Sequence, residues 1–417
     1  MSESLTTSVV AHPARGDARL RWSVLILAFL AVLLDGYDST ALGGCIPSLS
    51  RAWHVPASHF TAALSLTSAG VAVGYLTCGR LSARWGRRRV VMSAVLVFTV
   101  GSALTAMVTT MIGLDLVRLF TGLGLGAVLP AAVSLATAAN PARYRQTLAI
   151  FVAMAIAVGT LVAGLLGVRL IGLAGWRSVF VAGAVASALL LPALWYGLPD
   201  EGPDTTFDDA DRPTAQSSSV ARLFDHGYGV RTVLLWAFGF LMFTVYFIFS
   251  SWLPTLLTSY GFAVTLAPLG SAALGVGSII GAIVIMAAAL RYRMSSVLIG
   301  TTVLAIVFLA LSSRLGADKA LLLTVFGGVG LGLQAAMIGQ TGMAAAMYPS
   351  RTATTGVGWS ASMGRAGSVL GPIVGGILLG FGVPTRTIVL IACVPVVAAL
   401  LLVAELRRRT ALADRPR

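Results

Sequence analysis

Residues 22–48 read WSVLILAFLAVLLDGYDSTALGGCIPS, an apolar run in which only Asp35 and Asp38 are charged. A bilayer core about 30 Å thick is crossed by roughly 20 helical residues, so this run can span a membrane. The whole chain has the same character, because 57% of its 417 residues are hydrophobic and 11% are charged. Soluble domains have about 25% charged residues. The sequence therefore predicts an all-α, polytopic membrane protein.

Eleven further apolar segments follow, which makes twelve predicted transmembrane helices in two groups of six. They lie near 22–48, 58–79, 90–110, 111–139, 147–170, 177–197, 230–258, 264–290, 295–315, 319–347, 353–381 and 384–404. The acidic run 198–229 cannot lie in lipid, and it predicts a cytoplasmic linker between six-helix bundles at 22–197 and 230–404. Residues 1–21 and 405–417 are predicted tails, and the first lacks the pattern of a signal peptide.

The basic residues predict the orientation. The net charge is +14, and 21 of the 29 Lys and Arg residues fall in the tails and in loops on the side of the N-terminus. Cytoplasmic loops carry an excess of Lys and Arg, so both termini are predicted to be cytoplasmic. No nucleic-acid partner is expected, because the charge is spread over one membrane face without an aromatic-studded patch. The three distant cysteines predict neither a disulfide framework nor a metal site.

The two halves of the chain resemble each other. Pro47 matches Pro254 and Gly70 matches Gly277 at an offset of 207, and Gly159 matches Gly367 at 208. The segment FTGLGLG (120–126) matches FGGVGLG (326–332) at 206. An offset near half the chain predicts two repeated bundles with a substrate site between them near the midplane. The alternative is that the glycines serve only close helix packing.

Residues 79–90, GRLSARWGRRRV, resemble the signature loop of the major facilitator superfamily, G-x-L-a-D-R-x-G-R-R, with Ala83 in place of its Asp. DGYD (35–38) resembles the D-G-[YF]-D signature of the aromatic acid:H+ symporter family within it. VRLFTGLGLGAVLP (117–130) and GRAGSVLGPIVGG (364–376) are similar to two further motifs of that family. The resemblance implies a bacterial inner-membrane transporter that takes up a small aromatic carboxylate, of benzoate or hydroxybenzoate type, with protons, by alternating access.

The signature loop supplies candidate gating residues, which are Gly79, Arg80, Arg84, Gly86, Arg87 and Arg88. Its arginines are equally well explained as topology determinants. Arginines in such loops can also cap helix C-termini and contact anionic membrane lipid. Both interpretations stay open at this point.

Five charged residues lie inside predicted spans: Asp35, Asp38, Asp115, Arg118 and Arg365. A charge at the bilayer centre costs about 2.5–3.5 kcal/mol, so each requires a cavity or a partner. At a rise of about 1.5 Å per residue, Asp35, Asp38 and Arg118 lie at nearly the same depth. Two carboxylates near one guanidinium couple proton binding to the occupancy of that guanidinium. We therefore predict these three as the proton-coupling residues, with a structural ion pair as the alternative.

Arg365 lies in the eleventh predicted segment, near the midplane of the membrane. The residue that matches it in the first half of the chain is Ala157. A substrate carboxylate would bind a guanidinium in bidentate fashion, and aromatic side chains would stack on a planar substrate. The predicted substrate-binding residues are Asp38, Arg118, Arg365, Tyr37, Tyr246, Trp359, Gln334 and Gln340. For the two glutamines, hydrogen bonds between packed helices are the alternative. The proton is the expected coupling ion, no cofactor is expected, and the protein is expected to work as a monomer.

Two other functions stay open. Proton-coupled antiporters that export small organic compounds carry G-x8-G-x3-G-P-x2-G-G in their fifth helix, but here the pattern occupies residues 358–376, in the eleventh. A non-transporting membrane sensor is expected to bring a signalling domain, for which the tails and linker are short. An enzyme is not predicted, because the polar residues at depth form no nucleophile and base set.

Overall fold

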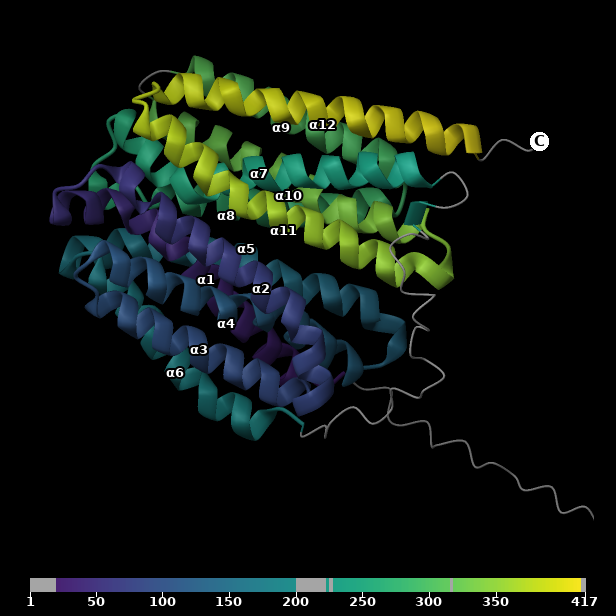
Figure 1. Cartoon of the computed structure of the whole chain (residues 1–417), viewed down its shortest axis with the longest axis horizontal. Helices are drawn as coiled ribbons and strands as arrows, with labels where there is room; N and C mark the ends of the chain where they lie inside the picture. Colours follow the sequence, from purple (N-terminus) through teal and green to yellow (C-terminus); the bar gives the residue numbers. More distant parts are fainter. Residues whose placement is uncertain (1–19, 200–222, 225–227, 316–317, 414–417) are drawn as a thin grey trace, which may run out of the picture.

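The computed structural model describes residues 20–199, 223–224, 228–315 and 318–413. Within these ranges, twelve helices are long and apolar enough to cross a membrane, and they run side by side (Figure 1). The elements are α1 Trp22–Trp53, η1 Ala57–Phe60, α2 Thr61–Trp85, α3 Arg87–Met107, α4 Met111–Ala138, η2 Ala142–Tyr144, α5 Arg145–Ala174, α6 Arg177–Gly197, α7 Gly229–Ser259, η4 Val264–Leu266, α8 Leu269–Ala289, α9 Met294–Arg314, α10 Lys319–Met347, α11 Ser350–Gly380 and α12 Thr385–Ala413. The predicted twelve-helix fold is confirmed.

The last helix is longer than its apolar segment. α12 continues to Ala413, through residues that the sequence assigns to a tail. Glu405 accepts hydrogen bonds from Arg408 at 2.8 Å and from Arg409 at 2.7 Å, and pairs at these spacings support a helix outside lipid. Most of the predicted linker and the N-terminal tail lie outside the described residues.

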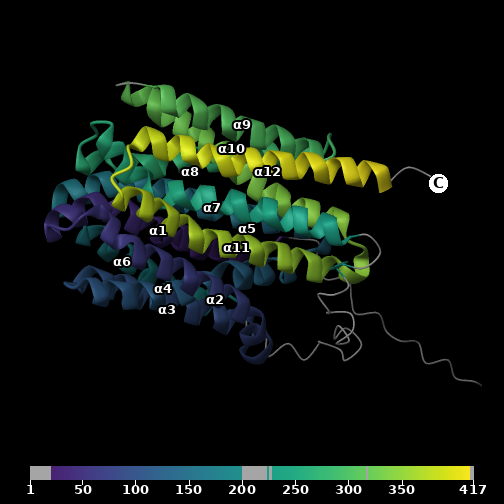
Figure 2. The same cartoon turned by 45° about the horizontal axis from the view of Figure 1, so that its top comes forward.

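The helices form two bundles with the same internal arrangement. α1 packs on α5, α2 on α4, and α3 on α4 and α6, while α7 packs on α11, α8 on α10, and α9 on α10 and α12. Figure 1 shows α1–α6 in the lower half of the view and α7–α12 in the upper half. In the rotated view of Figure 2 the helices again run side by side. Adding six to each helix number converts one bundle into the other, which confirms the predicted repeat.

Glycine contacts determine the register of the repeat. A Cβ on Gly122 of α4 would meet the backbone carbonyl of Thr67, and a Cβ on Gly330 of α10 would meet that of Leu274. Thr67 and Leu274 are 207 residues apart, like the other positions matched between α2 and α8. Gly122 and Gly330 are therefore equivalent at an offset of 208, two residues from the offset read from the sequence.

This register changes the repeat partner of Arg118. The sequence match at 206 places Thr324 opposite Arg118, whereas the packing places Phe326 there. Asp38 has Val245 as its partner, because α1 and α7 begin 207 residues apart. Val245 and Phe326 are both fully buried in one hydrophobic cluster. The second bundle thus has apolar side chains where the first bundle has a charged pair.

The bundles meet along α1 and α7, α5 and α8, and α2 and α11. Small residues allow close approach there, as is usual where membrane helices pack. A Cβ on Gly43 of α1 would lie 2.7 Å from the backbone carbonyl oxygen of Ser251 in α7. A Cβ on Gly164 of α5 would collide with Ala272 of α8. The helix α1, which carries both aspartates, is therefore held directly at the interface.

Candidate functional site

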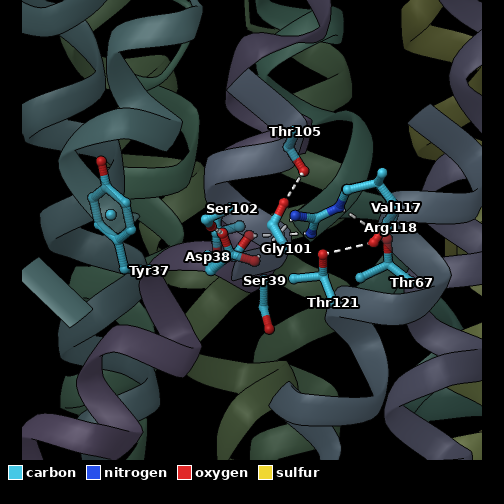
Figure 3. A network of polar contacts seen from close by, with 12 residues as sticks. Tyr37, Asp38, Ser39, Thr67, Gly101, Ser102, Thr105, Val117, Arg118 and Thr121 are labelled. Carbon is cyan, nitrogen blue, oxygen red and sulfur yellow. Dashed lines mark hydrogen bonds and ion pairs between the residues drawn. The ribbon is translucent and has the colours of Figure 1, made fainter. Parts of the chain in front are cut away.

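Asp38 and Arg118 form an ion pair inside the first bundle (Figure 3). Arg118 Nη1 lies 3.0 Å from Asp38 Oδ2, and the Arg118 and Asp38 side chains are only 0% and 3% exposed. Nη2 donates to the Asp38 backbone carbonyl at 3.3 Å, and Nε donates to the Thr67 hydroxyl at 3.2 Å. The three nitrogens of this guanidinium are thus all used within the protein.

Neighbouring helices complete this pair. The Ser102 hydroxyl of α3 donates to Asp38 Oδ1, and the Phe180 ring of α6 lies 6.0 Å from the Arg118 guanidinium carbon. α4 begins at a capped turn, where the Thr110 hydroxyl accepts from the Gly113 amide at 3.2 Å. The close crossing of α2 and α4 at Gly122 places Thr67 beside Arg118. The pair is therefore fixed by α1, α2, α3, α4 and α6 together.

Asp35 does not join this pair. Its Oδ1 accepts a hydrogen bond from the Ser39 hydroxyl at 3.1 Å, and the residue is 6% exposed. Arg365 of α11 interacts with it electrostatically across the bundle interface, yet no salt bridge joins the two in the part of the chain that the structure describes. Residues three apart on a helix point about 60° apart, so Asp35 points in a different direction from Asp38, which meets Arg118 of α4.

Arg365 is half-buried and contacts an aromatic ring of the other bundle. Its guanidinium carbon lies 5.1 Å from the centroid of Tyr75 in α2. Among the described residues, no side chain or backbone group forms a hydrogen bond or a salt bridge with this guanidinium. The structure thus brings Arg365 near Asp35 and leaves its N–H donors available.

Two predicted aromatic ligands point elsewhere. The Tyr37 hydroxyl donates to the backbone carbonyl of Val179 in α6 at 2.8 Å, and Figure 3 shows its ring apart from the Asp38–Arg118 pair. The hydroxyls of Tyr246 and Ser278 lie 3.4 Å apart within the second bundle. Both tyrosines are buried and find a polar contact inside their own bundle, so the structure does not bring them to the charged residues.

The remaining predicted ligands lie in the second bundle. Gln340 Nε2 donates to the Ser360 backbone carbonyl at 3.0 Å, which is the bond between packed helices expected as the alternative. Gln334 is half-buried. Trp359 is 38% exposed and stacks on Trp236, with ring centroids 5.7 Å apart.

Only one residue of the signature segment 79–90 lies outside a helix. Gly86, at φ 84°, separates α2 from α3, and a Cβ would be strained there. Arg88 donates to the Trp195 backbone carbonyl near the C-terminus of α6, and its guanidinium carbon lies 5.4 Å from the Trp195 ring. Arg80 and Arg84 are exposed, and Gly79 has open space around it. Helix capping, one of the expected roles, is therefore present at Arg88.

Sequence reasoning missed four residues that contact the charged groups: Thr67, Tyr75, Ser102 and Phe180. Thr67 shares a helix face with Gly70 and Gly74, spaced three and seven residues on, so the glycine spacing could have indicated it. The other three have no such signal, because an uncharged side chain in an apolar helix does not reveal which neighbour it faces.

Comparison with known proteins places the chain in a family. A family model described as Major Facilitator Superfamily matches residues 28–315. The gallate transporter of Pseudomonas putida is 29% identical, over 93% of this chain and 92% of the relative. The 4-hydroxybenzoate transporter PcaK of the same organism is 31% identical, over 88% of each chain.

Solved structures show the same fold. The nucleoside transporter NupG matches with a TM-score of 0.72 at 17% identity, over 95% of this chain and all of that one. The D-xylose-proton symporter matches with a TM-score of 0.71 at 18% identity, over 92% of this chain and 97% of that one. The chain therefore belongs to the major facilitator superfamily, as a multi-pass transporter of a bacterial cell membrane and not as an enzyme.

Proposed function

We propose that this protein takes up a small aromatic carboxylate, of benzoate or hydroxybenzoate type, together with protons. The observation that carries the proposal is the Arg365 guanidinium at the bundle interface, which lies 5.1 Å from the Tyr75 ring of the other bundle. Its charge acts on Asp35 of α1, although no described residue forms a hydrogen bond or a salt bridge with it. The relatives that are named as transporters of gallate and 4-hydroxybenzoate support the substrate class. The relation to the D-xylose-proton symporter supports the fold alone.

Each charged residue has a distinct proposed role. Arg365 binds the substrate carboxylate, because no described residue uses its N–H donors and a guanidinium matches a carboxylate in bidentate geometry. Asp35 carries the proton, because it can bind one without first breaking an ion pair. One carboxylate on Arg365 and one proton on Asp35 leave the net charge of the site unchanged, which avoids an unbalanced charge inside the membrane. Asp38 and Arg118 join α1 to α4, and the charges of this pair also take part in proton coupling, so that transport needs them.

The direction of transport follows from the proposed coupling to the proton gradient. The arginine-rich loops support a cytoplasmic position for both described ends of the chain. A substrate released with its proton on that side is driven inward by the proton gradient of a bacterial cell.

Gradient-driven uptake tests the coupling. Proteoliposomes with an acidic exterior are expected to accumulate labelled 4-hydroxybenzoate, and Asp35→Asn is expected to remove this stimulation while leaving exchange of labelled for unlabelled substrate. Asp115→Asn is the matched control, because Asp115 is a half-buried carboxylate of α4 outside the proposed site. Uptake that ignores the gradient, or an Asp35→Asn variant with full stimulation, would contradict symport. Export driven by the gradient would instead support an antiporter.

Arg365→Lys tests the carboxylate site. Lysine keeps the charge but cannot offer two parallel N–H donors, so we expect the half-saturation concentration for 4-hydroxybenzoate to rise about tenfold or more. The control is Arg386→Lys, at an exposed arginine of α12. Equal half-saturation constants for wild type and Arg365→Lys would exclude bidentate binding.

A further inference from the structure

Arg365 is an unusual cation because, among the residues that the structure describes, no negative group touches it. It lies halfway along α11, fifteen residues from each end of the helix, and a guanidinium cannot lose its proton there to escape the cost of burial. Asp35 is near enough to attract it, but no carboxylate of the described chain lies within ion-pair distance. Some other contact must keep the side chain from moving onto Asp35.

Tyr75 supplies the contact that competes with Asp35. The ring belongs to α2 of the first bundle, and it lies beside a guanidinium of the second bundle at 5.1 Å. A cation is attracted to an aromatic face, and more strongly where water is excluded. Such a contact uses none of the N–H donors, and the Tyr75 hydroxyl itself makes no hydrogen bond in the described ranges. The ring face is thus the part of Tyr75 that acts on Arg365.

We propose that Tyr75 is a positioning residue, which holds the Arg365 guanidinium at the bundle interface, away from Asp35, with its donors open to a carboxylate ligand. The nature of that ligand rests on the proposed function above. A direct bond between Arg365 and Asp35 would fill the donors that the ligand needs. Tyr75 therefore prevents the site from closing on its own carboxylate.

The position of Tyr75 also ties this arrangement to the packing of the bundles. α2 and α11 are neighbours only because the bundles meet, and Gly74, next to Tyr75, is pressed against the Leu123 backbone of α4. A ring anchored on so tightly packed a helix cannot follow Arg365 if that side chain swings toward α1. The support is rigid, while the arginine is the flexible partner.

Equilibrium binding of labelled 4-hydroxybenzoate to purified protein tests this inference. Tyr75→Leu is expected to weaken binding by roughly 3- to 30-fold, the range between an exposed and a desolvated cation–aromatic contact. Tyr75→Phe keeps the ring face and is expected to bind as wild type does. Tyr75→Leu combined with Asp35→Asn is expected to recover most of the lost affinity, because the competing carboxylate is gone.

The outcomes separate the inference from the proposed function. If wild-type protein does not bind the compound at all, the proposed substrate class is wrong. If wild type binds and Tyr75→Leu binds equally well, Tyr75 has no positioning role although the function stands. If Tyr75→Phe binds as wild type does but Tyr75→Leu/Asp35→Asn binds no better than Tyr75→Leu, the ring contacts the ligand itself. That result would overturn the positioning role. Size-exclusion profiles of each variant show that the protein is folded.

Discussion

Asp38→Val alone is expected to lower the free energy of unfolding by about 3–5 kcal/mol and to abolish transport. The substitution leaves the fully buried Arg118 guanidinium without its carboxylate. Unlike a carboxylate, which can bind a proton when its partner is lost, arginine cannot become neutral. Arg118→Phe, which leaves Asp38 behind, is therefore expected to be the less damaging of the two single substitutions.

The double variant Asp38→Val/Arg118→Phe is expected to be about as stable as wild type and still inactive. The second bundle has Val245 and Phe326 at the equivalent positions, both fully buried, so the fold already accommodates this apolar pair. Replacing a buried ion pair by well-packed apolar residues is often neutral or stabilising. Stability and transport are thus expected to separate in one variant.

Thermal unfolding of the detergent-purified proteins measures these differences. The control is Thr67→Val, which removes only the hydroxyl that accepts from Arg118 Nε and is expected to cost about 1 kcal/mol. Asp38→Val protein as stable as the double variant would show that the Asp38–Arg118 pair does not hold the bundle together. Gradient-driven uptake by the double variant would show that the charges at these positions are dispensable for transport.

The helices could be predicted because each is a long apolar run that can be read directly along the sequence. The predicted segments 177–197 and 319–347 have the same bounds as α6 and α10. The signal fails where lipid no longer selects apolar residues, as in the part of α12 from Glu405 onward, where a charge pattern continues the helix. Length and hydropathy thus determine the spans but not the ends that leave the membrane.

The repeat shows a second limit. In the G-x-G-x-G of residues 122–126, an offset of 206 superimposes all three glycines on glycine, and an offset of 208 still superimposes two of them, Gly122 and Gly124. Only the carbonyl that each glycine faces distinguishes them. The choice matters for the site, because it decides that a phenylalanine, and not Thr324, replaces Arg118 in the second bundle.

The sequence predicts how deep in the membrane the charged residues lie, but not which neighbouring helix each of them faces. Counting residues from the helix ends is enough to place Asp35, Asp38 and Arg118 at one level, because the rise of a helix is constant. Which acid meets Arg118 depends on how α1 is rotated, and its apolar residues surround the helix without marking a face. The same uncertainty applies to Tyr37, whose hydroxyl finds a carbonyl in α6.

The other large effect concerns the crossing of α2 and α4. Gly122→Ala is expected to reduce stability by about 1–3 kcal/mol and to slow transport. The added methyl group would meet the Thr67 backbone carbonyl, which cannot move without moving α2. Separating the helices also pulls the Thr67 hydroxyl from Arg118 Nε. The added methyl group is therefore expected to disturb the Asp38–Arg118 pair indirectly, by separating α2 from α4.

Two matched variants separate packing from chemistry. Gly330→Ala creates the equivalent collision with the Leu274 carbonyl in the second bundle, so it is expected to lose similar stability while leaving Asp38 and Arg118 paired. Gly300→Ala, in the second turn of α9 with open space around it, is expected to be neutral or slightly stabilising, since alanine favours a helix over glycine. Thermal unfolding and uptake are measured for all three. A Gly122→Ala protein that unfolds at the same temperature as Gly300→Ala would mean that α2 and α4 can separate freely, and the packing would then not explain how Arg118 is held.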